Sequence, residues 1–185
     1  MRLPAFFDSE LFAEISREIE DAHFHPRSHD GIGEETAMEP NALLARVLMM
    51  INDHALFEMV REITGSDRIG CFEGRVYRML PSKEHYDSWH NDLGDARMVA
   101  MTVNLSPNGY AGGLLEMRER SSKEVFAELD NTGPGDAILF ELAQELQHRV
   151  TPVEGSYPKT ALAGWFKASP EFLSALRKGD WSAED

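Results

Sequence analysis

Residues 68–167 consist of short, apolar, β-rich segments separated by turns, a pattern typical of few folds other than sandwiches and barrels. The segment 97–105 is apolar on both faces and partly β-branched, which predicts a central strand covered on both sides. Residues 68–80 form another strand-like stretch. Shorter strand candidates follow at 114–118, 124–129, 137–140, 147–150 and 160–167. We therefore expect one compact β core over 68–167.

The residues before this core have a helical period instead. Asp8 or Ser9 is expected to cap a first helix, and residues 41–64 carry a second helical pattern that ends at Gly65. The stretch 23–35 is polar and contains proline and glycine, so it is expected to be a loop. Helices are thus predicted to precede the β core and to support it.

A short helix is expected to end the chain, because Ser169 can cap it and Pro170 suits its first turn. The length of 185 residues suits a single domain. The predicted class is mainly β, α+β, with helical support at 1–67, the β core at 68–167, and a C-terminal helix and tail at 168–185.

The charge balance excludes some partners. Lys and Arg total 18 against 32 Asp and Glu, a formal net charge of −14. A surface this acidic repels phosphate, so neither nucleic acid nor a membrane is an expected partner, whereas neutral or cationic substrates and metal cations remain open. The single cysteine, Cys71, cannot form an internal disulfide, and the apolar stretch Leu3 to Phe7 is too short for a secretory signal. We expect a cytoplasmic protein.

Two histidine–aspartate pairs stand out, His85-x-Asp87 and His90-x-Asp92. Residues two apart on a strand project from the same face, so such a pair can offer an imidazole and a carboxylate to one metal ion. A third ligand would complete the facial triad of non-haem Fe(II) oxygenases, and His148 in a predicted strand is a candidate. A bare pair of this kind is more often a surface histidine beside an aspartate.

A second histidine cluster and a downstream lysine offer further readings. His23, His25 and His29 lie in the predicted loop, where solvated histidines are more common than a metal site. Lys159 precedes an apolar strand that carries Trp165. A lysine there can aim a point charge at a carboxylate, although a solvated turn lysine is the simpler reading of that residue alone.

Taken in order, the motifs of residues 72–167 resemble the 2-oxoglutarate- and Fe(II)-dependent oxygenases, in their prolyl-4-hydroxylase-like branch. The shared order is H-x-D at 90–92, a long strand, G-G-x-L at 112–115, P-G-D-x-x-x-F at 134–140, H-x-V at 148–150, P-V, a basic residue and W-F at 165–166. Each piece is common, whereas the ordered set is specific. The resemblance implies a double-stranded β-helix, the jelly-roll of cupins, supported by the N-terminal helices.

The resemblance also implies residue roles. It selects His90, Asp92 and His148 as the iron ligands, and it leaves His85, Tyr86 and Trp89 as pocket-rim or packing residues. Lys159 takes the position that pairs with the C5 carboxylate of 2-oxoglutarate, which is often Arg in this branch. Further cosubstrate-binding positions are Tyr77, Leu115, Val150, Trp165 and Asn104, of which Asn104 departs from the tyrosine common in the branch.

The activity implied is hydroxylation of an unactivated C–H bond, with succinate and CO2 as coproducts. Fe(II), 2-oxoglutarate and O2 are the implied cofactors, with ascorbate as a candidate reductant. The branch favours an amino-acid side chain of prolyl type in a peptide or protein. A free amino acid or other small metabolite, a non-catalytic metal- or ligand-binding jelly-roll sensor, and a cupin enzyme without 2-oxoglutarate are the alternatives. The oligomeric state stays open.

Overall fold

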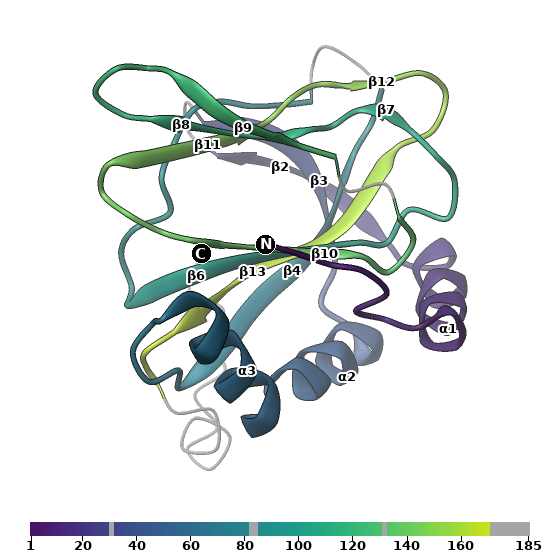
Figure 1. Cartoon of the computed structure of the whole chain (residues 1–185). Helices are drawn as coiled ribbons and strands as arrows, with labels where there is room; N and C mark the ends of the chain where they lie inside the picture. The colour runs from purple at the N-terminus through teal and green to yellow at the C-terminus, as the bar shows by residue number, and fades with distance from the viewer. Residues whose placement is uncertain (30–31, 82–84, 131–132, 171–185) are drawn as a thin grey trace.

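The computed structural model describes residues 1–29, 32–81, 85–130 and 133–170. Short strands dominate these ranges, and three helices lie before the β core (Figure 1). The helices are α1 (Ser9–Glu20), α2 (Ala42–Ile51) and α3 (His54–Thr64). The strands are β1 (Arg2–Leu3), β2 (Phe24–His29), β3 (Gly33–Met38), β4 (Cys71–Met79), β5 (Tyr86–Asp87), β6 (Arg97–Asn104), β7 (Ala111–Gly112), β8 (Leu115–Glu119), β9 (Val125–Leu129), β10 (Ala137–Glu141), β11 (Leu146–Val150), β12 (Val153–Glu154) and β13 (Lys159–Lys167).

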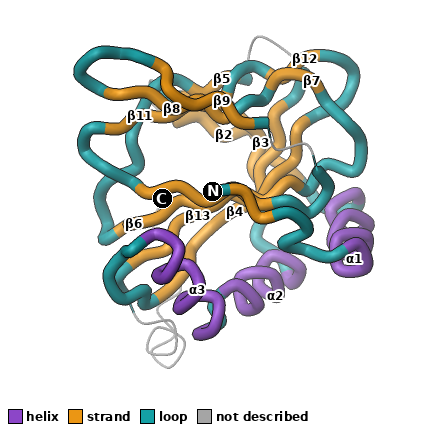
Figure 2. Tube along the Cα trace, in the orientation of Figure 1, coloured by secondary structure: helices purple, strands orange, loops and turns teal. Residues whose placement is uncertain are grey.

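Two antiparallel sheets build the core. The major sheet has the order β1-β10-β6-β13-β4-β3-β2, with β5 paired to β3, and the minor sheet has the order β11-β8-β9. A two-stranded ladder joins β12 to β7. The minor sheet faces one side of the major sheet, and the helices cover the other side (Figures 1 and 2). This arrangement is the predicted jelly-roll with helical support.

Side chains of the major sheet alternate between these two sides. Phe72, Val76, Leu162 and Phe166 are buried in the apolar core that includes residues of all three helices. Their neighbours along the strands, such as Tyr77, lie on the opposite face, toward the minor sheet. The helices therefore bury one face of the sheet, and the second face is left to build a site.

Polar side chains cap the N-termini of the helices, and a glycine ends α3. The Asp8 carboxylate accepts hydrogen bonds from Glu10 N and Leu11 N, which confirms Asp8 as the cap of α1. Gly65 ends α3 with a φ of 68°, as predicted. The helical pattern of 41–64 is two helices, because Asn52 ends α2 and Asp53 caps α3. None of the helices in the described ranges is long and apolar enough to cross a membrane.

The prediction of a loop at 23–35 is wrong. Strands β2 and β3 form a hairpin there, and β3 pairs with β4 at Thr36 and Ala37. Its polar residues are tolerated because β2 is the outermost strand of the sheet and its central residues, Pro26 among them, are exposed. The C-terminal helix predicted after Pro170 lies outside the described residues.

Candidate metal centre

His90, Asp92 and His148 come together between the two sheets. His90 follows β5 and forms an isolated antiparallel bridge with His148 of β11, in which each residue's N–H donates to the other's carbonyl, at 3.1 and 2.9 Å. Residues directly opposite on paired strands present their side chains side by side. The centroids of the two imidazole rings are accordingly 4.4 Å apart. Asp92 lies two residues after His90 in the chain.

The ligand atoms of the three side chains face one another. Nε2 of His148 is 3.2 Å from Asp92 Oδ2, and Nε2 of His90 is 3.5 Å from Asp92 Oδ1. One ligand atom from each residue lies within 4.8 Å of the others. Within the described ranges, no other group of three His, Cys, Asp or Glu residues meets this geometry.

The tautomer of His90 is fixed by its backbone partner. Nδ1 lies 2.7 Å from the Ser88 carbonyl oxygen, and since that oxygen only accepts, Nδ1 carries the hydrogen. In the neutral imidazole, which is the form that binds a metal ion, Nε2 is then the free nitrogen, and it faces Asp92 and His148. Two imidazoles and one carboxylate are the donor set that suits a non-haem Fe(II) ion, so these residues fit the metal that the sequence implies.

Trp165 of β13 orients the Asp92 carboxylate. The indole Nε1 donates a hydrogen bond of 2.8 Å to Asp92 Oδ2. Burial by itself raises the pKa of Asp92, but the hydrogen bond from His148, the charges of His148 and His90, and the Trp165 hydrogen bond hold it well below its usual range. Asp92 is therefore an anion, as a metal ligand must be.

Asp87 supports the same site, and the sequence interpretation missed it. Its Oδ1 is 3.4 Å from His90 Nδ1, and its Oδ2 accepts a hydrogen bond of 2.8 Å from Val150 N. Asp87 thus links the segment of the first histidine to β11, which carries the other. Its partner in the discarded pair, His85, instead accepts a hydrogen bond from Leu80 N at 3.0 Å. The signal in the sequence was the position of Asp87 three residues before His90.

Lys159 is a buried cation, only 2% exposed. Its Nζ donates a hydrogen bond of 2.6 Å to the Gly113 carbonyl, and within the described ranges no carboxylate pairs with it. Burial lowers the pKa of Lys159 to about 8. A buried ammonium group without a counterion suits an anionic ligand, so this position fits a carboxylate of 2-oxoglutarate.

The remaining predicted cosubstrate residues divide into two groups. Tyr77 and Val150 belong to one apolar cluster with Met79, Val153 and Ala161, and Val150 is paired across the sheet with buried Leu115. Asn104 is buried, but its Nδ2 donates to the Gly133 carbonyl at 3.1 Å and its Oδ1 accepts from Ser106 N at 3.0 Å. The nitrogen and the oxygen of the Asn104 side-chain amide therefore both have backbone partners, and the contact of Asn104 with 2-oxoglutarate stays a prediction.

The second histidine cluster lies elsewhere. His25 and His29 are part of the edge strand β2, where His29 Nε2 is 3.3 Å from Glu35 and 3.4 Å from an Arg75 nitrogen.

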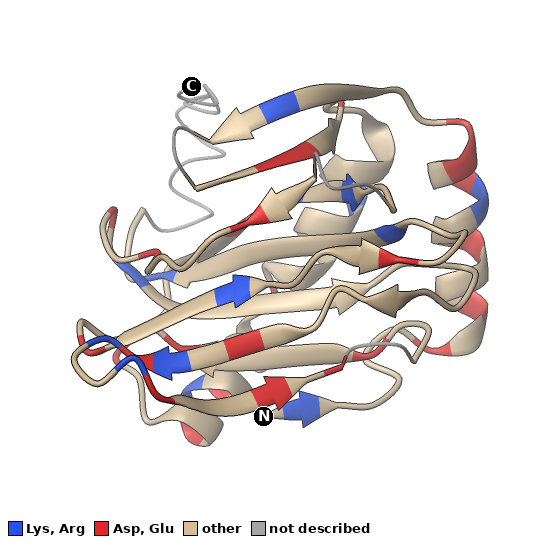
Figure 3. Cartoon of the chain, turned by 90° about the horizontal axis from the view of Figure 1, so that it is seen from above, with Lys and Arg blue, Asp and Glu red and all other residues tan. Residues whose placement is uncertain are grey.

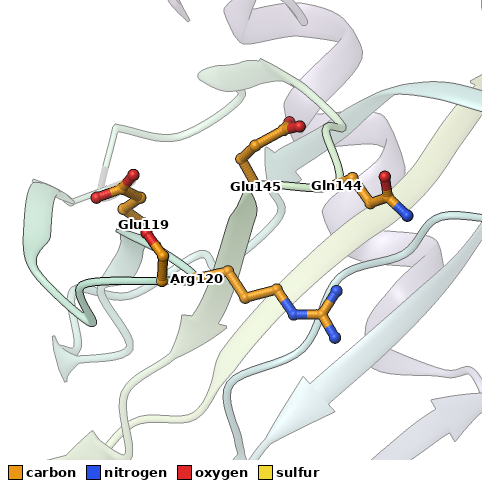
Figure 4. Close-up of a pocket in the computed structure, with 5 residues that line it drawn as sticks. Glu119, Arg120, Gln144 and Glu145 are labelled. Carbon is orange, nitrogen blue, oxygen red and sulfur yellow. The ribbon is translucent and has the colours of Figure 1, made fainter.

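A surface hollow lies between the turn after β8 and the loop before β11, with Glu119 and Arg120 on one side and Gln144 and Glu145 on the other (Figure 4). It contains none of the candidate metal ligands.

Comparison of the sequence with protein-family models matches residues 74–167 to a family described as the 2OG-Fe(II) oxygenase superfamily. This range includes His90, Asp92, His148 and Lys159. A search of curated proteins found no match.

Solved structures share the fold at low sequence identity. A prolyl-4-hydroxylase from Pseudomonas putida is 19% identical, with 92% of each chain covered and a TM-score of 0.67. A 2OG-Fe(II) oxygenase family oxidoreductase from Burkholderia pseudomallei is 16% identical, with 92% of this chain and 86% of that chain covered and a TM-score of 0.69. A Trichoplax adhaerens prolyl hydroxylase, in complex with a hypoxia inducible factor peptide fragment, is 17% identical, with 91% and 83% covered and a TM-score of 0.69. These matches confirm the predicted fold.

Proposed function

The chain belongs to the 2OG-Fe(II) oxygenase superfamily, and from this membership we propose that it hydroxylates an unactivated C–H bond of an amino-acid side chain in a peptide or protein. As a dioxygenase of this superfamily it uses Fe(II), 2-oxoglutarate and O2. Proline is the first candidate residue, with succinate and CO2 as coproducts. The likeness of the fold to two prolyl hydroxylases, one of them bound to a peptide, supports this choice of substrate.

We assign the metal to His90 Nε2, the Asp92 carboxylate and His148 Nε2. The observation that carries this assignment is their convergence, with the His90 tautomer set by Ser88 and Asp92 held as an anion. Bound Fe(II) with 2-oxoglutarate and O2 supplies the oxidising chemistry, and the protein supplies binding and orientation. Asp87 and Trp165 hold the ligands in place from outside the metal.

We assign the far carboxylate of 2-oxoglutarate to Lys159. The buried ammonium group lacks a counterion among the described residues, and the anion would replace the Gly113 carbonyl as its strongest partner. Tyr77, Leu115 and Val150 would line this part of the site and exclude water from it, because all three lie in or beside the apolar cluster next to Lys159. A cytoplasmic location is part of the proposal, since the buried thiol of Cys71 suits a reducing compartment.

The test is incubation with Fe(II), 2-oxoglutarate and a pool of proline-containing peptides and metabolites, scored by succinate formation and by mass shifts of one oxygen atom. His90→Ala is expected to abolish both signals, because it removes one of the three proposed metal ligands. His85→Ala is the matched control, since this histidine contacts Leu80 N and not the triad. Succinate formation that survives in His90→Ala would overturn the assignment.

A further inference from the structure

Cationic side chains line the face of the major sheet that looks toward the minor sheet, and most are already paired. Arg75 Nε donates to Glu35 at 2.8 Å. Lys167 Nζ donates to Glu73 at 2.9 Å and also to Asp95. Lys159 contacts a backbone carbonyl and is assigned above to the cosubstrate. The fourth cation, Arg97, differs from these.

Among the residues that the structure describes, the guanidinium of Arg97 has no hydrogen-bond acceptor at Nε. Its Cζ lies 3.8 Å from the centroid of the Trp165 ring, so stacking holds the group in place. Its Nε is buried without a hydrogen-bond partner, and within the described ranges no carboxylate forms an ion pair with it. A buried N–H without an acceptor destabilises the folded protein, and a bound acceptor would remove that cost.

Arg97 is close to the metal ligands, since the Trp165 ring that it covers donates to Asp92. It is far from Lys159, because Arg97 pairs with Lys167 at the opposite end of β13. Eight residues of strand separate the two lysines by about 26 Å. The anion that Arg97 would bind is therefore not the carboxylate held by Lys159, and it belongs to a second molecule at the metal.

We propose that Arg97 binds a carboxylate of the substrate, next to the carbon that is oxidised. This inference rests on the proposed function and specifies its substrate class. A carboxylate matches the planar fork of a guanidinium, and an arginine already stacked on an indole loses little freedom on binding. The carboxylate has two sources, the α-carboxylate of a free amino acid or an acidic side chain beside the oxidised residue of a peptide.

Binding measurements with paired probes test this proposal. Protein loaded with Mn(II) and 2-oxoglutarate without O2 is titrated calorimetrically with L-proline against L-prolinamide, and with acetyl-Gly-Pro-Glu-amide against acetyl-Gly-Pro-Gln-amide. Each pair differs only in a carboxylate. At least one acid is expected to bind about tenfold more tightly than its amide, as a charge-assisted hydrogen bond provides. The pair that shows the preference identifies the source.

Variants assign the preference to Arg97. Arg97→Met is expected to reduce it to about twofold or less, and Arg97→Lys to an intermediate value, because lysine keeps the charge and loses the fork. Arg118→Met is the matched control, since Arg118 also stacks on an indole, 4.2 Å from the Trp89 ring centroid, on β8 in the minor sheet. Thermal unfolding and Mn(II) affinity show whether each variant is folded and binds metal. If Arg97→Met does not fold, the carboxylate preference of Arg97→Lys tests the proposal.

The proposal is overturned if neither acid binds better than its amide in the wild-type protein, including the case in which no probe binds. It is also overturned if the preference persists unchanged in both Arg97 variants. Succinate formation with Fe(II) and 2-oxoglutarate is measured separately on the same proteins. Succinate without a carboxylate preference leaves the proposed function standing, whereas a carboxylate preference without succinate under any condition contradicts the proposed function instead.

Discussion

Trp165 contacts both the Asp92 carboxylate and two arginine side chains. Its Nε1 donates to Asp92, and its ring carries Arg97 at 3.8 Å and Arg75 at 5.8 Å from their guanidinium carbons. These arginines come from β6 and β4, the two strands that flank β13. An indole held from both neighbouring strands has little freedom, so the carboxylate that it contacts is also held.

Trp165→Phe is expected to weaken Mn(II) binding by about tenfold or more, because it removes the hydrogen bond to Asp92 while it keeps most of the ring. Isothermal titration calorimetry of the metal-free protein measures this. Trp89→Phe, which removes an indole that lies against Arg118 and Arg149, is expected to bind Mn(II) like the wild type. Equal affinities in Trp165→Phe and wild type would show that the hydrogen bond is dispensable.

The proposed role of Lys159 predicts that 2-oxoglutarate binding depends on pH. Because burial lowers its pKa to about 8, Lys159 is charged below pH 8 and loses its charge as the pH rises through that value. The dissociation constant for 2-oxoglutarate, measured with Mn(II)-loaded protein between pH 7 and 9, is therefore expected to rise above pH 8 and to approach about tenfold per pH unit. Lys159→Arg is expected to flatten this dependence, since arginine stays charged throughout. The same slope in both proteins would assign the titration to another group.

Strand β13 is the element on which the site depends. It pairs with β4 along its whole length and with β6 along most of it, and it carries Lys159 and Trp165 on one face. The helices cover the opposite face. Asn52, at the end of α2, fixes this contact: its amide donates to the Phe72 carbonyl at 2.9 Å and accepts from Phe72 N at 2.8 Å. These are backbone groups of β4 beyond the two residues that pair with β3.

Asn52→Ala is expected to lower the free energy of unfolding by about 2 kcal/mol, because it leaves the Phe72 N–H and C=O without their side-chain partners. Mn(II) affinity is expected to stay unchanged, since the metal ligands lie on the other side of the sheet. Urea denaturation followed by circular dichroism measures the first quantity. Asn108→Ala, at an exposed turn, is the control and is expected to be neutral. A large loss of metal affinity in Asn52→Ala would indicate that the helices also shape the site.

Across the whole molecule, the centre joins separate parts of the fold. Two of the proposed ligands follow β5 and the third lies in the minor sheet, and Trp165 of the major sheet donates to one of them, Asp92. Acidic residues are scattered over several strands, loops and helices rather than gathered on one element (Figure 3). Against a net charge of −14, local cations such as Lys159 and Arg97 are needed to attract any anion into the interior.

Mn(II) at a hundred times its dissociation constant is expected to stabilise the wild-type protein by about 2.7 kcal/mol, a rise of roughly 5–10 °C in Tm. His148→Ala is expected to lose this response, because the metal then has two ligands. His54→Ala, at a histidine whose side chain is 88% exposed, is expected to keep it. Differential scanning calorimetry decides, and a similar rise in His148→Ala would place the ion elsewhere.

The strands of the β core could be predicted closely, because their apolar residues recur at short, regular spacing between turns. The segments 97–105 and 160–167 correspond to β6 and β13 within one residue at each end. The hairpin at 24–38 could not be predicted, because an edge strand with polar residues on both faces has no apolar period. The break between α2 and α3 was hidden by continuous helical periodicity through Asn52.

The sequence by itself determined the fold class, the family resemblance and the residues proposed as metal ligands, because these depend on local periodicity and on motif order. The tertiary structure decided what those residues contact: the bridge between His90 and His148, the support of His90 by Asp87, and the absence of an acceptor for Arg97 among the described residues. Such contacts join residues far apart in the chain or on different faces of a loop. They depend on strand register, which only the folded sheets define.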